Sequence, residues 1–260
     1  MNQELKETFI ANLGEWEWDE SWKSFSELDP EFFEASVRLK AVPKKSEHLS
    51  PKVQSFISLA VNSSSTHLYA PGVRANIKEA LANGATGAEI KEIIQLTSTL
   101  GIHACNVGVP TLVEVMKEEG LYDSHPTAGK PLDASKLQLQ EDFTQKRGYW
   151  HSFWEEFLAL DPDFFAAYTT FSSAPWLPDD SKAKNLGVLE PKVKELIYCA
   201  FDAAATHLYR PGLKEHMRNA LRYGATVEEI LEVLEIASQL SIHTANLAYP
   251  ILAEELESKK

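Results

Sequence analysis

The stretch Thr66-His67-Leu68-Tyr69-Ala70-Pro71-Gly72 occurs a second time in the chain, as Thr206-His207-Leu208-Tyr209-Arg210-Pro211-Gly212. The 140-residue offset between the two copies holds without a gap from Pro51/Pro191 to Glu114/Glu254, and 27 of these 64 paired positions are identical. This agreement indicates an internal duplication. A repeated unit has to form the same structure twice, so it decides how the rest of the chain is interpreted.

Composition restricts the partners that the protein can have. The chain has 260 residues, 44% of them hydrophobic and 24% charged, which is typical of a globular protein with a substantial core. Its formal net charge of −13, without a basic cluster, disfavours nucleic acid and anionic membrane surfaces. We therefore expect no nucleic-acid or membrane partner.

The start of the chain and the two cysteines indicate a cytoplasmic location. Residues 1–13 lack the apolar segment of a signal peptide, and no apolar run is long enough to span a bilayer. Cys105 and Cys199 occupy non-equivalent positions of the two copies, which argues against a disulfide common to both. We expect free thiols in a reducing cytoplasm.

Periodicity predicts helices throughout and no convincing strand, so the expected fold class is all-α. An aromatic-rich arm precedes each repeated core, with Trp18 and Trp22 in the first arm and Trp150 and Trp154 in the second. We interpret these aromatics mainly as helix packing. The expected divisions are a first arm (1–50), a first core (51–119), a linker (120–140), a second arm (141–190) and a second core (191–260).

Turn and cap residues mark the helices inside each core. Proline opens two helices, glycine ends the second of them, and a capping box opens a third. These positions are Pro51, Pro71, Gly84 and Thr86–Glu89 in the first copy, and Pro191, Pro211, Gly224 and Thr226–Glu229 in the second.

Two polar clusters recur in both copies and are candidates for a site. The first follows a helix end and the second places a histidine and an asparagine three residues apart on one helix face. The simplest interpretation of the second cluster is that the histidine and asparagine bond each other or nearby backbone, and we predict no metal site. The residues concerned are Thr66, His67, Tyr69, His103 and Asn106, and their equivalents Thr206, His207, Tyr209, His243 and Asn246.

A third cluster exists only in the second copy. His216 corresponds to Asn76, and Glu195, on the preceding predicted helix, corresponds to Ser55. A carboxylate and an imidazole on adjacent helices could form a proton relay, although two solvated side chains explain the residues equally well.

With these residues identified, the chain resembles the carboxymuconolactone decarboxylase and alkylhydroperoxidase D-like superfamily, here as a tandem of two helical domains. The resemblance covers 51–118 and 191–257. It implies an intramolecular pseudo-dimer and, because single-domain relatives form rings, a homo-oligomer. In the peroxidase branch two cysteines would fall on Tyr69 and Gly72, or on Tyr209 and Gly212, so a dithiol peroxidase is not expected.

The same resemblance implies where the chemistry would occur. The relay histidine of the superfamily falls on His216, and the relay glutamate falls near Ile197, two residues from Glu195. This implies cofactor-independent decarboxylation or isomerisation of a small carboxylated lactone or related cyclic acid. His207 or Tyr209 would stabilise the enolate-like charge. Two alternatives stay open: a non-catalytic binding or assembly protein, and residual hydroperoxide reduction.

Overall fold

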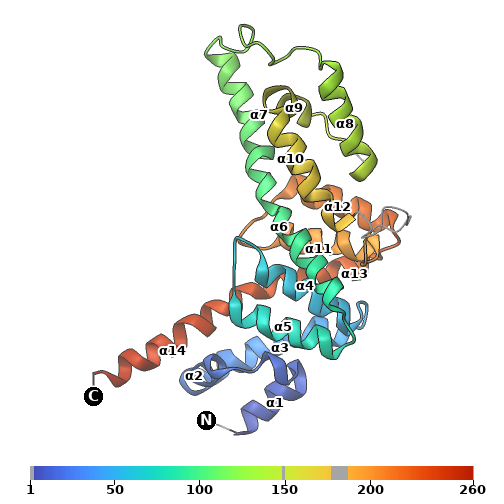
Figure 1. Cartoon of the computed structure of the whole chain (residues 1–260). Helices are drawn as coiled ribbons and strands as arrows, with labels where there is room; N and C mark the ends of the chain where they lie inside the picture. Colours follow the sequence, from blue (N-terminus) through green and yellow to red (C-terminus); the bar gives the residue numbers. More distant parts are fainter. Residues whose placement is uncertain (1–2, 148–149, 177–186, 260) are drawn as a thin grey trace. The chain divides into compact units, whose positions relative to one another are not determined.

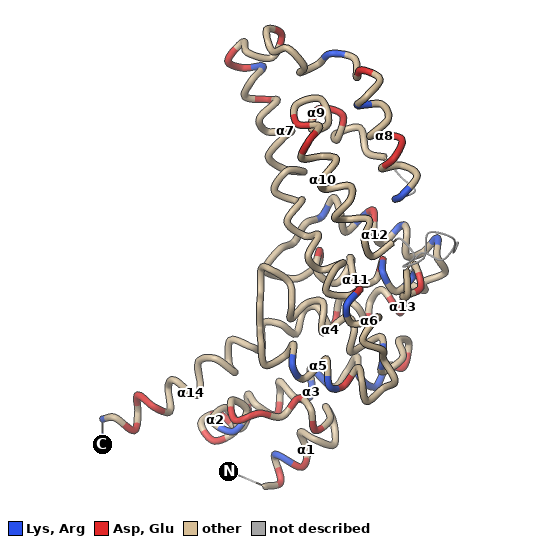
Figure 2. Tube along the Cα trace, viewed as in Figure 1, with Lys and Arg blue, Asp and Glu red and all other residues tan. Residues whose placement is uncertain are grey.

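The structure, a computed structural model, describes residues 3–147, 150–176 and 187–259, which form helices joined by turns (Figure 1). These ranges contain α-helices and short 3-10 helices and no strand, which confirms the all-α prediction. Within the same ranges, none of the helices has the combination of length and apolar character that crossing a membrane requires. Acidic positions are spread over many helices rather than gathered in one place (Figure 2).

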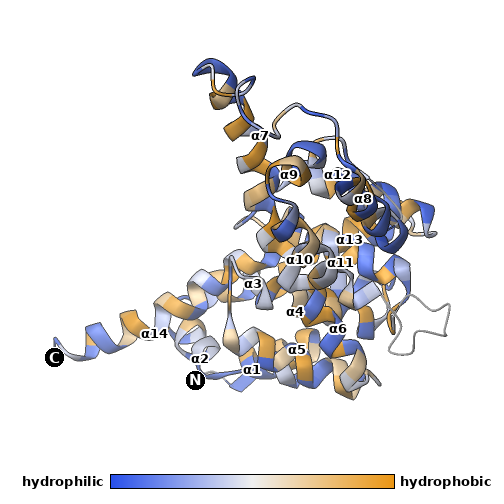
Figure 3. Ribbon diagram, turned by 45° about the horizontal axis from the view of Figure 1, so that its top comes forward, coloured by the Kyte–Doolittle hydropathy of each residue, from blue (hydrophilic) through white to orange (hydrophobic). Residues whose placement is uncertain are grey.

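Each repeated core contains three helices in the same order. In the first core these are α4 (Pro51–Ser63), α5 (Ala70–Ala82) and α6 (Gly87–Ser98). In the second they are α11 (Pro191–Ala203), α12 (Arg210–Arg222) and α13 (Val227–Ser238). Hydrophobic residues are prominent in α4 (Figure 3).

The local signals in the sequence explain where these helices begin and end. Thr226 and Glu229 form the predicted capping box at the start of α13. Thr86 and Glu89 make the same reciprocal contacts before α6, at 2.7 Å and 3.2 Å. Gly84 and Gly224 have φ values of +82° and +88°, a left-handed conformation that glycine adopts without steric cost at a helix end.

Two compact units can be distinguished, and each is described by itself. The first comprises residues 1–97 and 189–260, and the second comprises residues 98–188. These units do not coincide with the arms and cores expected from the repeat. Both three-helix cores belong to the first unit, together with the first arm and the last helix of the chain.

Reciprocal contacts join the two cores within the first unit. The buried carboxylate of Glu232 in α13 accepts hydrogen bonds from the backbone of Leu49 at 3.1 Å and from the side chain of Gln54 at 2.7 Å. At the equivalent place, Glu92 in α6 accepts from the backbone of Leu189 at 3.1 Å and pairs with Lys194 at 2.5 Å. Each core therefore supplies a glutamate that fixes the start of the first helix of the other core.

The first arm packs on the end of the chain. It consists of α1 (Gln3–Leu13), the 3-10 helix η1 (Glu15–Glu17), α2 (Glu20–Leu28) and α3 (Pro30–Ser46). It contacts α14 (His243–Glu257), which follows the 3-10 helix η4 (Gln239–Ile242) and runs past α2 (Figure 1). Their shared core confirms that the arm aromatics serve helix packing, and it contains Phe9, Leu13, Trp22, Phe25, Phe33, Val37, Ala41, Ile242 and Ala245.

The second unit repeats this arrangement with the other arm. It contains the 3-10 helix η2 (Thr99–Ile102), α7 (His103–Glu118), α8 (Ala134–Arg147), α9 (Trp154–Leu160), α10 (Pro162–Ser173) and the 3-10 helix η3 (Ala174–Trp176). Here the last helix of the first repeat, α7, packs against the second arm. The buried core consists of Ile102, Phe143, Trp154, Phe157, Leu158 and Phe165.

The expected linker at 120–140 needs a correction. Its end, from Ala134 onward, is the beginning of α8 rather than a loop. Before α8, Ala128 is buried and the Tyr122 hydroxyl donates a hydrogen bond to Glu156 of α9. Gly, Pro and Ser positions thus form a packed turn region there. In the second arm, residues 177–186 lie outside the described ranges.

Candidate functional site

The repeated motif forms a turn between the first and second helices of each core. The backbone N–H of Tyr69 donates to the carbonyl of Asn62, and that of Tyr209 donates to the carbonyl of Asp202, both at 2.9 Å. The leucine of each motif, Leu68 or Leu208, is exposed and has a φ of +51°, which is uncommon for a residue with a branched side chain. Both copies therefore maintain the same strained turn, a feature that the sequence pattern did not reveal.

The two turns also meet each other. The hydroxyl oxygens of Thr66 and Thr206 lie 3.2 Å apart, at hydrogen-bonding distance. The repeated motifs are therefore neighbours at the junction of the two cores. Neither threonine hydroxyl is buried, so this contact can tie the turns together without a large desolvation cost.

In the second core, Glu195 and His216 form a buried pair. His216 Nδ1 lies 2.6 Å from Glu195 Oε2, which brings α11 and α12 together at this point. The Tyr198 ring stacks on the imidazole, with ring centres 4.3 Å apart and an interplanar angle of 15°. A carboxylate at Nδ1 fixes the orientation and tautomer of a neutral imidazole, leaving Nε2 as the atom that can accept a proton.

This pair clarifies the alignment of the relay glutamate. The superfamily pattern places that residue near Ile197, but Ile197 is an apolar core residue with no exposed surface. Glu195, half a turn earlier, is the side chain that reaches His216. The helical periodicity of α11 explains the difference, because a shift of two residues turns a side chain to another face of the helix.

Asp202 adds a second buried carboxyl to this cluster, and the sequence interpretation overlooked it. Burial raises the pKa of Asp202 to about 7, with the His216 charge lowering the pKa and Glu195 raising it. One of its carboxylate oxygens lies within 4.8 Å of a ring nitrogen of His207. A carboxylate and an imidazole are both groups that divalent cations accept as ligands. The cue in the sequence was the Asp202/Asn62 difference between the copies.

The first core is neutral at the same three positions. Ser55, Asn62 and Asn76 stand where the second core has Glu195, Asp202 and His216. All three are buried, and Asn62 Nδ2 donates to Asn76 Oδ1 at 2.7 Å. The same fold thus accommodates either an ionisable or a neutral set, which indicates that folding alone does not require the ionisable one.

His243 lies beside the motif of the first copy. Its Nδ1 is 2.8 Å from Nε2 of His67, and its ring stacks on Tyr69 with centres 3.9 Å apart. Burial and the nearby Lys40 lower the pKa of His243 to about 2, so the imidazole is neutral. The sequence left open whether His207, His216 and His243 share a pocket. The structure pairs His243 with His67, while His207 and His216 both lie near Asp202.

The histidine–asparagine clusters also require a correction. We expected each histidine to bond its asparagine or nearby backbone, but the partners of the asparagines come from the aromatic arms. Asn246 Nδ2 donates to Ser21 Oγ at 2.9 Å, and Asn106 Oδ1 accepts from Trp154 Nε1 at 2.9 Å. His103 is half-buried at the start of α7. Because α14 and α7 each pack on an arm, their polar side chains meet arm residues that are distant in the sequence.

A pocket of about 390 Å³ opens beside the first motif. It lies among η1, α2, α5 and the start of α14, all within the first unit. Its volume is in the range of small-molecule sites, and its lining mixes aromatic and charged groups. The lining residues are Trp16, Glu17, Trp18, Asp19, Trp22, Tyr69, Ala70, Pro71, Gly72, Arg74, Ala75, Lys78 and His243.

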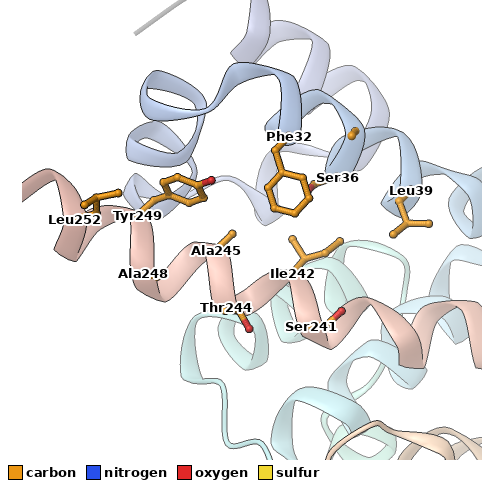
Figure 4. A pocket seen from close by; sticks show the side chains of 11 residues that line it. Phe32, Ser36, Leu39, Ser241, Ile242, Thr244, Ala245, Ala248, Tyr249 and Leu252 are labelled. Atoms are coloured by element: carbon orange, nitrogen blue, oxygen red, sulfur yellow. The ribbon is translucent and has the colours of Figure 1, made fainter.

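A second hollow, of about 730 Å³, lies between α3 and α14 and is almost entirely apolar (Figure 4). Phe32, Leu39 and Leu252 line it with side chains that are about half exposed. Tyr249 lines it as well, and its hydroxyl is occupied by a hydrogen bond to Asp29 at 2.8 Å. This surface lacks titratable groups suited to acid–base catalysis.

Both cysteines are unsuited to redox chemistry. Cys199 is buried in α11, and burial together with Glu195 and Asp202 raises the pKa of its thiol. Burial and Asp161 also raise the pKa of Cys105. Because the thiolate is the reactive form, these shifts disfavour attack on a peroxide.

Known proteins are similar to this chain in both sequence and fold. The model of the carboxymuconolactone decarboxylase family matches residues 162–241, a range that includes Glu195, His207 and His216. No curated protein sequence matches the chain. A crystal structure of a protein from Burkholderia xenovorans LB400, provisionally assigned as a gamma-carboxymuconolactone decarboxylase subunit, is 47% identical. The match covers 99% of this chain and 98% of the other, with a TM-score of 0.89. The chain therefore belongs to the carboxymuconolactone decarboxylase family.

Proposed function

We propose that the second core is a cofactor-independent acid–base site that decarboxylates or isomerises a small carboxylated lactone or related cyclic acid. The observation that supports this is the buried 2.6 Å hydrogen bond between Glu195 and His216, at positions where the first core has Ser55 and Asn76. Family membership and the Burkholderia protein's assignment as a decarboxylase subunit support the same reaction class.

In the proposed decarboxylation, the bond between the ring carbon and the carboxylate carbon breaks and carbon dioxide leaves. The electron pair of that bond delocalises toward the lactone carbonyl, forming an enolate. A proton that Nε2 of His216 has taken up from solvent is then delivered to carbon, and Glu195 holds the imidazole while its charge changes. Isomerisation would use the same residues, with His216 removing a proton from one carbon and returning it to another.

The enolate oxygen requires hydrogen-bond donors. Tyr209 packs against Gly212 beside Asp202, and His207 lies close to the same carboxyl group. We assign the oxyanion contacts to Tyr209 and His207, and a substrate contact to Thr206. Six other residues stay proposed substrate contacts. They are His67 and Tyr69 of the first core, His243 and Asn246 from α14, and His103 and Asn106 from α7.

The test measures carbon dioxide release from carboxylated γ-lactones by the wild type and by His216→Asn and Glu195→Gln. We expect each variant to reduce kcat by about 10²–10⁴-fold, the usual contribution of a positioned acid–base group. A triple variant, Glu195→Ser/Asp202→Asn/His216→Asn, reproduces the first core and should fold normally while losing turnover.

Cys105→Ala is the matched control and should leave carbon dioxide release unchanged. Unaltered kinetics in His216→Asn would refute the assignment. Lactone turnover that is absent in the wild type, together with thiol-dependent hydroperoxide turnover, would favour the redox alternative. Absence of both activities would favour a binding or assembly role.

A further inference from the structure

The pocket of the first core contains acidic and basic groups, and the acidic ones are already engaged. Glu17 is half-buried; burial acts to raise its pKa, but Lys40 and Lys44 overcome this and lower it. Its carboxylate is 3.6 Å from the Lys40 ammonium group. Asp19 caps α2 by accepting hydrogen bonds from the N–H and hydroxyl of Ser21, at 2.9 Å and 2.5 Å. The Glu17 charge is therefore balanced by Lys40, and one Asp19 oxygen is occupied by the helix cap.

The two basic side chains that line the pocket, in contrast, are not balanced by a neighbouring carboxylate among the described residues. Arg74 and Lys78 are one helical turn apart on α5, whose basic positions are visible in Figure 2, and both line the pocket. Within the part of the chain that the structure describes, Arg74 has no carboxylate partner. The Lys78 ammonium group lies 5.5 Å from the centre of the Trp16 ring. A ligand entering here meets cationic donors, although the whole chain carries a net charge of −13.

Comparison with the second copy shows that, within the described ranges, a basic pair without an ion-pair partner is specific to the first copy. Lys214 and Arg218 correspond to Arg74 and Lys78, so both copies have a basic pair on this helix. In the second copy, however, Glu215 stands where the first has Ala75, and Glu215 forms an ion pair with Arg218. In the first copy the acidic residue of this helix, Glu79, forms an ion pair with Lys44 of α3 instead.

The aromatic side chains that line the pocket favour a ligand with a flat ring. Three indole side chains line it together with Tyr69, whose pKa is raised to about 12 by burial and by the nearby Asp19 and Glu17. The phenol therefore stays protonated, and its hydroxyl is hydrogen-bonded to the Ser21 side chain. Aromatic side chains favour flat rings, and guanidinium and ammonium groups favour carboxylates.

From these observations we propose that the first core holds a non-catalytic binding site for a small, planar, one-ring carboxylate. The ring lies among the tryptophans and the carboxylate faces Arg74 and Lys78. This site lacks the glutamate–histidine pair, so it binds its ligand without converting it. Binding here does not depend on any activity of the second core.

Benzoate is a suitable probe, with benzamide as its neutral analogue and benzylamine as its cationic one. We expect benzoate to quench the intrinsic tryptophan fluorescence saturably, with a calorimetric stoichiometry that includes one site insensitive to His216→Asn. Benzamide and benzylamine should bind at least about tenfold more weakly, because a lost charge-assisted hydrogen bond typically has an effect of this size. Raising the salt concentration should weaken benzoate binding.

The decisive comparison uses matched double variants. Arg74→Gln/Lys78→Gln should weaken benzoate binding at least about tenfold without changing the melting temperature. Lys214→Gln/Arg218→Gln, which alters the equivalent pair of the second copy, should leave this fluorescence response unchanged. Lack of saturable benzoate binding in the wild type would overturn the proposal. So would equal affinity for benzamide, or equal losses in the two double variants. Each of these readings is obtained without turnover, so a failed lactone assay would not affect it.

Discussion

At the residue scale, the close packing around Gly212 holds Asp202 in place. A Cβ atom at Gly212 would come within 2.4 Å of an Asp202 carboxylate oxygen and 2.7 Å of the Tyr209 ring. Gly72 has the same constraint against Asn62 and Tyr69, at 2.5 Å and 2.7 Å. The glycine of the repeated motif is thus required because a buried polar side chain from the preceding helix occupies the space.

This packing predicts the effect of Gly212→Ala. The new methyl group must displace Asp202 or Tyr209, so we expect a loss of about 1–3 kcal/mol in the free energy of unfolding. Gly87→Ala is the control, because no atom lies within 4 Å of a Cβ built at that exposed position. Urea denaturation measures both. A Gly212→Ala protein as stable as the control would show that the side chains of Asp202 and Tyr209 move aside at little cost.

Asp202 also predicts a pH dependence of stability. Its pKa is raised from 3.8 to about 7, so the folded state binds the proton more tightly than the unfolded state. The contribution of Asp202 to stability is therefore fully present below about pH 4 and decreases as the pH rises toward 7, above which it is constant.

Replacement of Asp202 by asparagine, the residue at position 62, should remove this dependence. We expect Asp202→Asn to gain about 2–4 kcal/mol relative to the wild type between pH 4 and pH 8, since each pKa unit corresponds to about 1.4 kcal/mol. Chemical denaturation across this pH range measures the difference. A difference between the two proteins that does not vary with pH would contradict a raised pKa.

At the scale of helices, each core is fixed to the other by a buried glutamate with different partners. Lys194 in α11 has no exposed side-chain surface and pairs with Glu92 in α6. At the equivalent place, neutral Gln54 donates to Glu232. The buried glutamate is thus satisfied by an ion pair in one copy and by a charge-assisted hydrogen bond in the other.

This pair of solutions allows a matched test. Lys194→Met leaves the Glu92 carboxylate buried without its cation and should cost about 3–5 kcal/mol of stability. Lys194→Gln copies the arrangement of the first core and should cost clearly less. Lys192→Met removes a partly exposed pair with Glu229 and should cost at most about 1 kcal/mol. Thermal and urea unfolding measure all three, and an equal cost for the Met and Gln replacements at Lys194 would contradict this account.

At the scale of the whole molecule, the apolar hollow between α3 and α14 predicts self-association. Phe32 and Leu252 line it, with exposures of 53% and 46%. Apolar surface that gathers in this way on a globular protein usually contacts a partner. A second copy of the chain is the partner expected from the family resemblance.

Light scattering should therefore give a mass above that of one chain. Phe32→Glu and Leu252→Glu should each shift the mass toward the single chain, because a carboxylate in an apolar interface is costly to desolvate. Leu137→Glu changes an exposed leucine on α8 and is the control. A monomeric wild type would contradict the expectation of a homo-oligomer.

The duplication would also allow one chain to carry the two sites that we propose. The turns and helices are kept in both copies, while the buried residues beside them differ in charge. The second core has Glu195, Asp202 and His216. At the equivalent positions the first core has neutral residues, and its Arg74 and Lys78 line a pocket. We infer that one half keeps the acid–base chemistry and the other keeps ligand recognition.

Local physical rules made much of this protein predictable from its sequence. The starts of helices, the glycines that end them and the capping boxes all depend on residues within one or two helical turns. They could therefore be placed correctly from the sequence. The repeat offset identified equivalent positions, and the Glu195/His216 difference from Ser55/Asn76 indicated the ionisable cluster. Family resemblance implied the reaction class that we propose and placed a relay glutamate near Ile197, two residues from the glutamate that contacts His216.

The sequence by itself therefore determined the all-α class, the duplication and the residues that could carry chemistry. Only the tertiary structure decided which of them meet. Glu195 and His216 come together because α11 packs on α12, and His243 reaches His67 because α14 folds back to the first core. The pairing of each last helix with the arm of the other repeat likewise depends on burying aromatic surface between distant segments. Such long-range packing has no local signal, because apolar surface is non-directional and many pairings could bury it.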